Sequence, residues 1–187
     1  MNFFKPKFWD KTEFSLFSLL LYPITLIIKL LTLLKPLLAK KNQCSIPVIC
    51  VGNIYLGGTG KTPFSIELLS ILERLGKKAC FVIKNHNLTE DENKLLSKFG
   101  SVFTSSNRGD SVELAHKNGF DIAIMDDGFQ DFSLEKNFSF LCFDEKLWIG
   151  NGLLIPAGPL RESLKSGIKR ANCILIKGKK NIPIENK

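Results

Sequence analysis

The chain has 187 residues, enough for one domain with a full core or for one domain plus an appendage. Its formal charge is +8, but residues 1–41 alone carry +5, a distribution that points to anionic lipid more than to nucleic acid. No zinc-finger or RNP-like pattern supports a nucleic-acid partner, and five widely spaced cysteines without C-x-x-C exclude a disulfide framework and favour a reducing cytosol.

Residues 14–34 predict an apolar helix that contacts a membrane. An Asp10-x-x-Glu13 capping box precedes the run. The polar residues recur every three or four positions and would form one narrow stripe on a helix: Ser15, Ser18, Tyr22, Thr25, Lys29 and Thr32.

Three kinds of segment fit this run: a spanning helix, a cleaved signal peptide, and a helix lying on or dipping into the membrane surface. Pro23 and Lys29 interrupt the run, no convincing cleavage site follows, and lysines flank it on both sides. We therefore favour the surface helix, with its polar stripe toward the protein or the lipid headgroups. Residues 1–41 are the expected membrane-associated segment, and residues 42–187 are the expected nucleotide-binding α/β domain.

Residues 51–63, V-G-N-I-Y-L-G-G-T-G-K-T-P, predict a phosphate-binding loop. A β-branched run at 46–51 precedes the loop and a helical pattern opens at Lys61. Glycines let backbone N–H groups face an anion, and the helix N-terminus adds positive charge. Lys61 would reach the β- and γ-phosphates, while the Thr62 hydroxyl would coordinate Mg²⁺. Tyr55 stands where the usual G-x-x-x-x-G-K-[ST] pattern has its first glycine, so an ordinary glycine-rich turn is the alternative.

Strands and helices alternate after the loop. Helices are expected at 61–75, at 89–99 and at 110–118, the last behind an Asp110-x-x-Glu113 capping box. Strands are expected at 78–83, 101–104, 121–126, 138–143 and 172–176. This alternation predicts an α/β fold, with a doubly wound and mostly parallel sheet around the P-loop.

Two further stretches belong to the predicted site. The strand at 121–126 ends in Asp126-Asp127-Gly128, which would bring two carboxylates to the carboxyl edge of the sheet, opposite the P-loop. The alternative is a strand that simply ends in a turn. The glycine- and proline-rich stretch 149–162 would hold Arg161 and Glu162 near the same edge.

Three motifs together resemble the tetraacyldisaccharide 4′-kinases, the lipid A 4′-kinases of Gram-negative bacteria. They are the loop at 51–63, D-D-G-F-Q at 126–130, and G-N-G through P-A-G-P-L-R-E at 150–162. The resemblance implies transfer of the γ-phosphoryl group of ATP, with Mg²⁺, to the 4′-hydroxyl of a tetraacylated glucosamine disaccharide 1-phosphate. It also implies a location at the cytoplasmic face of the inner membrane, in contact with inner-membrane lipids.

The resemblance assigns roles residue by residue. The element Glu90-Asp91-Glu92 is similar to the family's G-D-E, so Asp91 inherits activation of the sugar hydroxyl. The implied ATP-binding residues are Tyr55, Leu56, Gly57, Gly58, Thr59, Gly60, Lys61 and Thr62. The implied catalytic residues are Lys61, Asp91, Asp126, Asp127 and Glu162. The implied metal ligands are Thr62, Glu92, Asp126 and Gln130.

The chain also departs from the family. Asp131 replaces the family's usual histidine, the S-R-G-Y-G-G stretch is absent at 83–87, and the family's second α/β lobe has no counterpart. We therefore expect either a split or truncated gene product, with a separate polypeptide supplying the second lobe if the gene is split, or a reduced form whose activity is weak or lost. Two other functions stay open: a membrane-associated P-loop ATPase or GTPase switch, although N-K-x-D is missing, and a non-catalytic remnant.

Overall fold

A computed structural model describes residues 5–10, 15–40, 42–84 and 90–178. Its centre is one six-stranded sheet in the order β3-β2-β4-β1-β5-β6, and every neighbouring pair of strands is parallel. The strands are β1 (Val48–Gly52), β2 (Ala79–Lys84), β3 (Val102–Ser105), β4 (Ile122–Asp126), β5 (Phe138–Asp144) and β6 (Cys173–Lys177).

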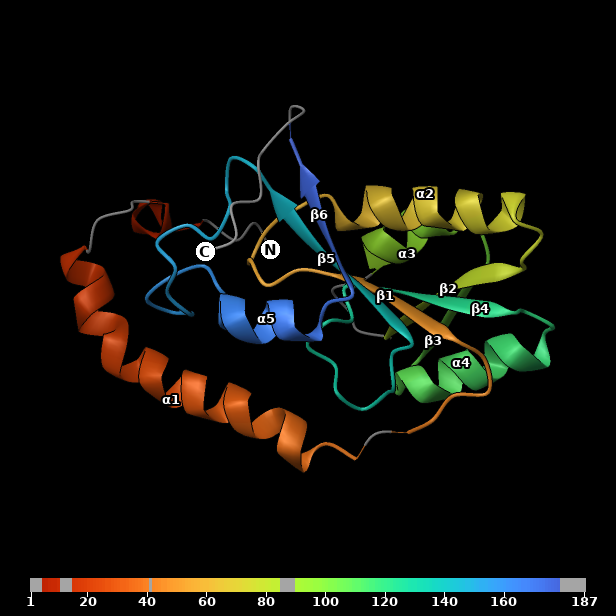
Figure 1. Ribbon diagram of the computed structural model, residues 1–187, viewed down its shortest axis with the longest axis horizontal. Coiled ribbons are helices and arrows are strands. Elements are labelled where there is room, and N and C mark those ends of the chain that lie inside the picture. The colour runs from red at the N-terminus through yellow and green to blue at the C-terminus, as the bar shows by residue number, and fades with distance from the viewer. Residues whose placement is uncertain (1–4, 11–14, 41, 85–89, 179–187) are drawn as a thin grey trace.

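Helices cover both faces of the sheet, which confirms the doubly wound fold. Figure 1 shows α2 (Lys61–Arg74) and α3 (Glu90–Leu96) on one face, and α4 (Arg108–Lys117) and α5 (Leu164–Arg170) on the other. Alternate side chains of β1 enter different cores, since Val48 and Cys50 pack with the α4 side and Val51 packs with the α2 side. A sheet covered on both faces explains why its strands are continuous apolar runs.

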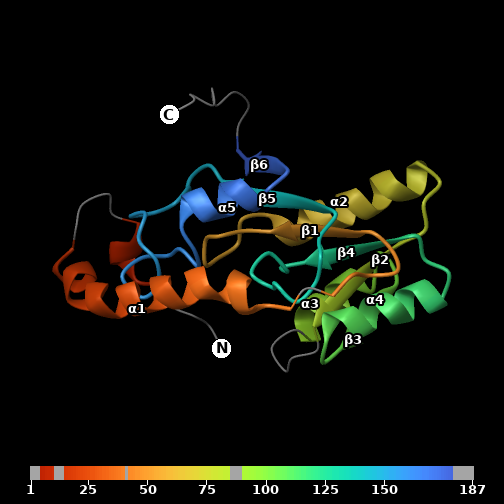
Figure 2. The ribbon, with the colours of Figure 1, turned by 60° about the horizontal axis from the view of Figure 1, so that its bottom comes forward.

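The apolar N-terminal helix forms as expected, but it is longer. Helix α1 (Leu16–Leu38) continues through Pro36 and lies beside the α5 face of the domain (Figures 1 and 2). By length and composition it could cross a membrane, with a mean hydropathy of 2.1 in its most apolar window. Its buried residues are Ser18 and Thr25, so part of the predicted polar stripe faces the protein.

The helix boundaries bring one correction, one prediction that stays untested and one omission. Helix α4 begins at Arg108, and the Asn107 side chain caps it by accepting a hydrogen bond from the Gly109 N–H at 3.0 Å. The expected capping box at Asp110 was therefore wrong, because an asparagine three residues earlier already pairs with the first free N–H. Helix α1 has Ser15 at its N-cap, and most of the expected Asp10 box lies outside the described residues. Helix α5 was not predicted.

Candidate active site

The glycine-rich loop after β1 forms a cradle at the carboxyl edge of the sheet. Gly60 has a φ of 84°, in the left-handed region that glycine adopts without strain. The buried Asn53 side chain holds the loop from beneath, because its Nδ2 donates to the Gly57 carbonyl at 3.1 Å and to the Thr59 hydroxyl at 2.9 Å. A cavity of about 330 Å³ lies above the loop and is lined by residues 57–63, Glu92, Asp127 and Arg161.

Asp126 meets the phosphate loop as the sequence predicts. It ends β4, which pairs directly with β1 in the register Val51 to Asp126. The Thr62 hydroxyl donates to Asp126 Oδ2 at 2.8 Å and the Ser65 hydroxyl donates to Oδ1 at 3.0 Å. Burial raises the pKa of Asp126, and these two hydrogen bonds oppose the shift.

Thr62 and Asp126 have the donor chemistry of a magnesium site. Thr62 lines the cavity, and the buried Asp126 lies directly behind it through their hydrogen bond. Both supply hard oxygen ligands, and Mg²⁺ in phosphate sites uses one or two carboxylates together with waters and phosphate oxygens. Within the described residues no group of three or more His, Cys, Asp or Glu could hold a metal. The protein ligands therefore fit Mg²⁺ only together with a bound phosphate.

Asp127 lies between two positive charges. Its backbone is in the left-handed region, with a φ of 50°. Its carboxylate is 3.6 Å from the Lys61 ammonium, and it accepts hydrogen bonds from the Arg161 guanidinium at 2.9 and 3.3 Å. Burial alone would raise the pKa of Asp127, but Lys61 and Arg161 outweigh burial and lower it. Asp127 therefore stays ionised and holds both cations at the cavity.

Gln130 and Glu162 form hydrogen bonds that link the segments around the site. Gln130 Nε2 donates to the Asn53 carbonyl at 2.7 Å and to Glu162 at 3.0 Å, and its Oε1 accepts from Arg161 at 3.3 Å. Glu162 is buried and forms an ion pair with Arg170. Neither side chain lines the smaller cavity. Gln130 lines the larger cavity beside it, and Glu162 contacts the site through Gln130, so the catalytic role of Glu162 and the metal role of Gln130 stay predictions.

The acidic element on α3 presents Glu92 to the cavity. Glu92 lines its wall, and its pKa is raised by partial burial and then by the negative charges of Asp126 and Asp127. Asp91 is exposed and belongs to the lining of neither this cavity nor the larger one beside it. The side chain of Tyr55, in contrast, is buried, and its hydroxyl donates to Asp10 at 3.0 Å. It does not line the smaller cavity, so its expected role in ATP binding stays a prediction.

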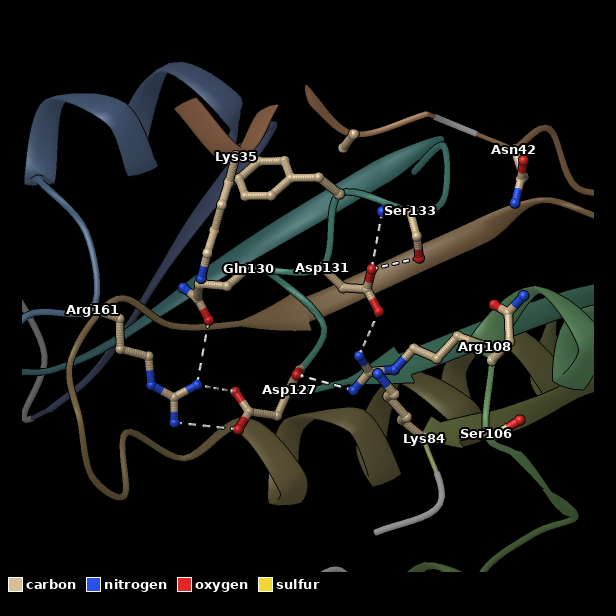
Figure 3. A pocket seen from close by; sticks show the side chains of 13 residues that line it. Lys35, Asn42, Lys84, Ser106, Arg108, Asp127, Gln130, Asp131, Ser133 and Arg161 are labelled. Carbon is tan, nitrogen blue, oxygen red and sulfur yellow. Dashed lines mark hydrogen bonds and ion pairs between the residues drawn. The ribbon is translucent and has the colours of Figure 1, made fainter. Parts of the chain in front are cut away.

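A second cavity, of about 660 Å³, adjoins the first and shares Asp127 and Arg161 with it (Figure 3). Lys35 extends into it from α1, and Lys84 lies at the end of β2. Four cationic and two acidic side chains line it. Its wall therefore combines positive charge with the end of the apolar helix.

Arg108 is a functional candidate that the sequence analysis missed. Its guanidinium donates to Asp131 at 2.8 Å and to the Asp127 carbonyl at 3.3 Å. Burial would raise the pKa of Asp131, but hydrogen bonds from Ser133 and Arg108 lower it to about 2. A signal was available, because Arg108 closely follows a strand, and residues after parallel strands gather at the ligand-binding edge of the sheet.

Comparisons with known proteins agree with this geometry. A family model described as LpxK, tetraacyldisaccharide-1-P 4′-kinase, matches residues 17–87 and 84–187. The tetraacyldisaccharide 4′-kinase of Pelagibacter ubique is 44% identical over 166 residues, which are 89% of this chain and 52% of the relative. The relative from Rickettsia akari is 35% identical over an alignment 199 positions long, gaps included, which covers 97% of this chain and 60% of the relative.

A solved structure is similar as well. The crystal structure of LpxK from Aquifex aeolicus in complex with ATP superposes with a TM-score of 0.77 at 27% identity, covering 91% of this chain and 62% of that one. The chain thus spans between half and two thirds of the length of these similar proteins.

Proposed function

The chain belongs to the tetraacyldisaccharide-1-phosphate 4′-kinase family, and on that basis we propose that it serves transfer of the γ-phosphoryl group of ATP to the 4′-hydroxyl of a tetraacylated disaccharide 1-phosphate, a step of lipid A biosynthesis. The observation that carries the proposal is the meeting of Thr62 with Asp126, beside the cluster of Lys61, Asp127 and Arg161. Phosphoryl transfer depends mainly on positioning and charge neutralisation, which these groups supply.

Each cavity has its own role in this proposal. The backbone of residues 57–62 and the Lys61 ammonium would bind the triphosphate in the smaller cavity, with Mg²⁺ at Thr62 and Asp126. The larger cavity would bind the polar head of the lipid acceptor, because cationic side chains line it and one of them, Lys35, lies near the end of α1. Asp127 and Arg161 line both cavities, so γ-phosphate and acceptor would meet at these two residues.

The test is transfer of radiolabelled phosphate from ATP to the disaccharide lipid. Label in the lipid supports the kinase. ATP hydrolysis that does not depend on the lipid would favour the ATPase switch, and nucleotide binding without turnover would favour the remnant. Transfer that requires addition of the remaining half of a full-length relative would support the predicted separate polypeptide.

Asp91 and Glu92 are two candidates for the residue that activates the 4′-hydroxyl of the acceptor. The family resemblance assigns this role to Asp91, and apo geometry alone does not exclude a catalytic base. We expect Asp91→Asn to slow transfer by about a hundredfold with ATP affinity unchanged, and Glu92→Gln to raise the Mg²⁺ concentration required. Initial rates measured across a Mg²⁺ titration check both. Full activity in Asp91→Asn, with loss in Glu92→Gln, would move the role to Glu92.

Helix α1 is proposed to hold the protein on the cytoplasmic face of the inner membrane. Its outward side chains are leucine, isoleucine and phenylalanine, most of them more than half exposed, and Lys29 and Lys35 lie in the same helix. An apolar face with nearby lysines suits an anionic membrane surface.

Charges placed on this face should release the protein from membranes. We expect the double variant Leu20→Asp and Ile27→Asp to bind vesicles of anionic phospholipid about a hundredfold more weakly, because two apolar side chains no longer enter the lipid. Co-sedimentation measures this binding. Leu75→Asp is the matched control, since Leu75 is an exposed leucine at the end of α2. Equal binding by the double variant and the control would refute membrane contact through α1.

A further inference from the structure

Thr25 ties α1 to the loop of residues 151–161, here called the seat loop. The Thr25 hydroxyl accepts a hydrogen bond from the Ala157 N–H at 3.1 Å and donates to the Leu154 carbonyl at 3.4 Å. Thr25 is only 3% exposed, although most of its neighbours on α1 are exposed. A buried hydroxyl that pairs with two backbone groups fixes the distance between helix and loop.

A second contact lies two helical turns earlier on the same side of α1. The Ser18 hydroxyl accepts from Asn151 Nδ2 at 3.4 Å. The same Asn151 amide donates to the Ala157 carbonyl at 2.9 Å, and Asn151 Oδ1 accepts from the Leu153 N–H at 3.1 Å. The internal shape of the seat loop is therefore linked to α1 at two points.

The other end of the seat loop leads directly into the site. The Leu160 N–H donates to the Leu153 carbonyl at 3.1 Å, the Arg161 N–H donates to the Ile54 carbonyl at 2.7 Å, and the Leu56 N–H donates to the Pro159 carbonyl at 2.8 Å. The first bond closes the loop on itself, and the other two join it to the chain between β1 and the glycine cradle. Arg161 then extends its guanidinium to Asp127.

We propose that Thr25 is a positioning residue, which through the seat loop sets where Arg161 stands relative to the helix that contacts lipid. The inference rests on two parts of the proposed function, that Arg161 acts at the triphosphate and that α1 acts at the membrane. The polar stripe of α1 then has a purpose beyond solvation. It keeps the helix on the domain while the leucines face lipid, so that the site stays at a fixed height above the membrane surface.

Three substitutions separate this role from simple packing. Thr25→Val keeps the shape of the side chain but leaves the buried Ala157 N–H without its partner. The Leu154 carbonyl loses the bond from Thr25 and keeps the one from the Gly158 N–H at 2.9 Å. Thr25→Ser removes a methyl group and keeps the hydroxyl. Thr32→Val is the matched control, because the Thr32 hydroxyl bonds to the Lys29 carbonyl of its own helix at 2.8 Å.

Hydrogen exchange of backbone amides in the full chain is the first readout. In Thr25→Val we expect exchange about tenfold faster at Ala157 and also at Leu160, Arg161 and Leu56, with the amides of β1 and β4 unchanged. Thr25→Ser and Thr32→Val should match the wild type. A change confined to Ala157 would overturn the proposal, because the loop would then transmit nothing to Arg161.

Phosphate transfer on vesicles that contain the lipid acceptor is the second readout. Thr25→Val should lower kcat by about tenfold while the Kd for ATP stays the same, and Thr25→Ser should restore kcat. If the wild type transfers no phosphate, the proposed function fails, and the exchange pattern alone decides the role of Thr25. If Thr25→Val also speeds amide exchange in β1 and β4, Thr25→Ala is tested by the same criteria. Faster exchange in β1 and β4 in both variants would overturn the proposal.

Discussion

Replacing Lys61 with methionine should reduce phosphate transfer to the lipid by about a thousandfold. The Lys61 side chain is 11% exposed, and its ammonium lies 3.6 Å from Asp127 in the wall of the smaller cavity. Methionine keeps much of the side-chain volume but removes the charge that would neutralise the γ-phosphate. Initial rates with radiolabelled ATP measure the loss, and circular dichroism shows whether the variant is folded.

Two companion variants define what a loss in Lys61→Met means. Lys98→Met removes an exposed positive charge just after α3 and should leave the rate unchanged. Lys61→Arg keeps the charge in a different shape and should recover only part of the activity, because a planar guanidinium does not replace a compact ammonium at a phosphate. Undiminished transfer by folded Lys61→Met would show that the glycine cradle is not the triphosphate site.

The fold was largely predictable because its signals are local. Parallel strands buried on both faces read as short apolar runs, and the run at 46–51 and the strand at 121–126 correspond to β1 and β4. The meeting of Asp126 with Thr62 was also predictable, since the carboxyl ends of parallel strands share one edge. Sequence alone did not show that β1 and β4 are adjacent, which the register Val51 to Asp126 establishes.

The parts that were missed depend on contacts between distant residues. Helix α5 contains Gly167, and glycine inside a helix predicts poorly. A Cβ there would lie 2.8 Å from Ile54, so close packing explains the glycine where propensity does not. Arg108 was missed altogether, and it reaches the Asp127 carbonyl from 19 residues away. Arg161 was expected near this edge of the sheet, but its pairing with the Asp127 carboxylate, 34 residues away, was not predicted. No local pattern encodes such distances.

In helix α1, too, a local pattern was predicted and the contacts with distant residues were not. Its polar spacing predicted a stripe on one side, and Ser18 and Thr25 of that stripe are buried. The groups that they contact, in residues 151–157, lie more than a hundred residues later in the chain. The glycine- and proline-rich stretch was expected only to hold Arg161, and its second role as a seat for the helix required the structure.

Asp126→Asn should remove magnesium dependence and, with it, transfer, with a fall in rate of about a hundredfold or more. Asparagine keeps the size of the side chain and can still bond to Thr62 and Ser65, but it lacks the negative charge that Mg²⁺ requires. A Mg²⁺ titration of ATP binding checks the first part and initial rates check the second. Wild-type Mg²⁺ dependence in the variant would place the metal elsewhere.

The same variant should be more stable than the wild type when Mg²⁺ and ATP are absent. Burial raises the pKa of Asp126 above its ordinary value of 3.8, so ionising this carboxyl destabilises the folded state at neutral pH. Below pH 3.8 the carboxyl is neutral in both states and the penalty disappears; the penalty grows as the pH rises toward the folded pKa.

Because asparagine never ionises, Tm should be higher in Asp126→Asn than in the wild type at neutral pH, and the two values should converge in acid. Thermal unfolding across this pH range measures the difference. A lower Tm for the variant at neutral pH would mean that the hydrogen bonds from Thr62 and Ser65 stabilise the carboxylate by more than burial destabilises it. A higher Tm for Asp126→Asn at neutral pH would show that the Asp126 carboxylate lowers the stability of the fold, so its role would lie in binding the metal and not in stabilising the fold.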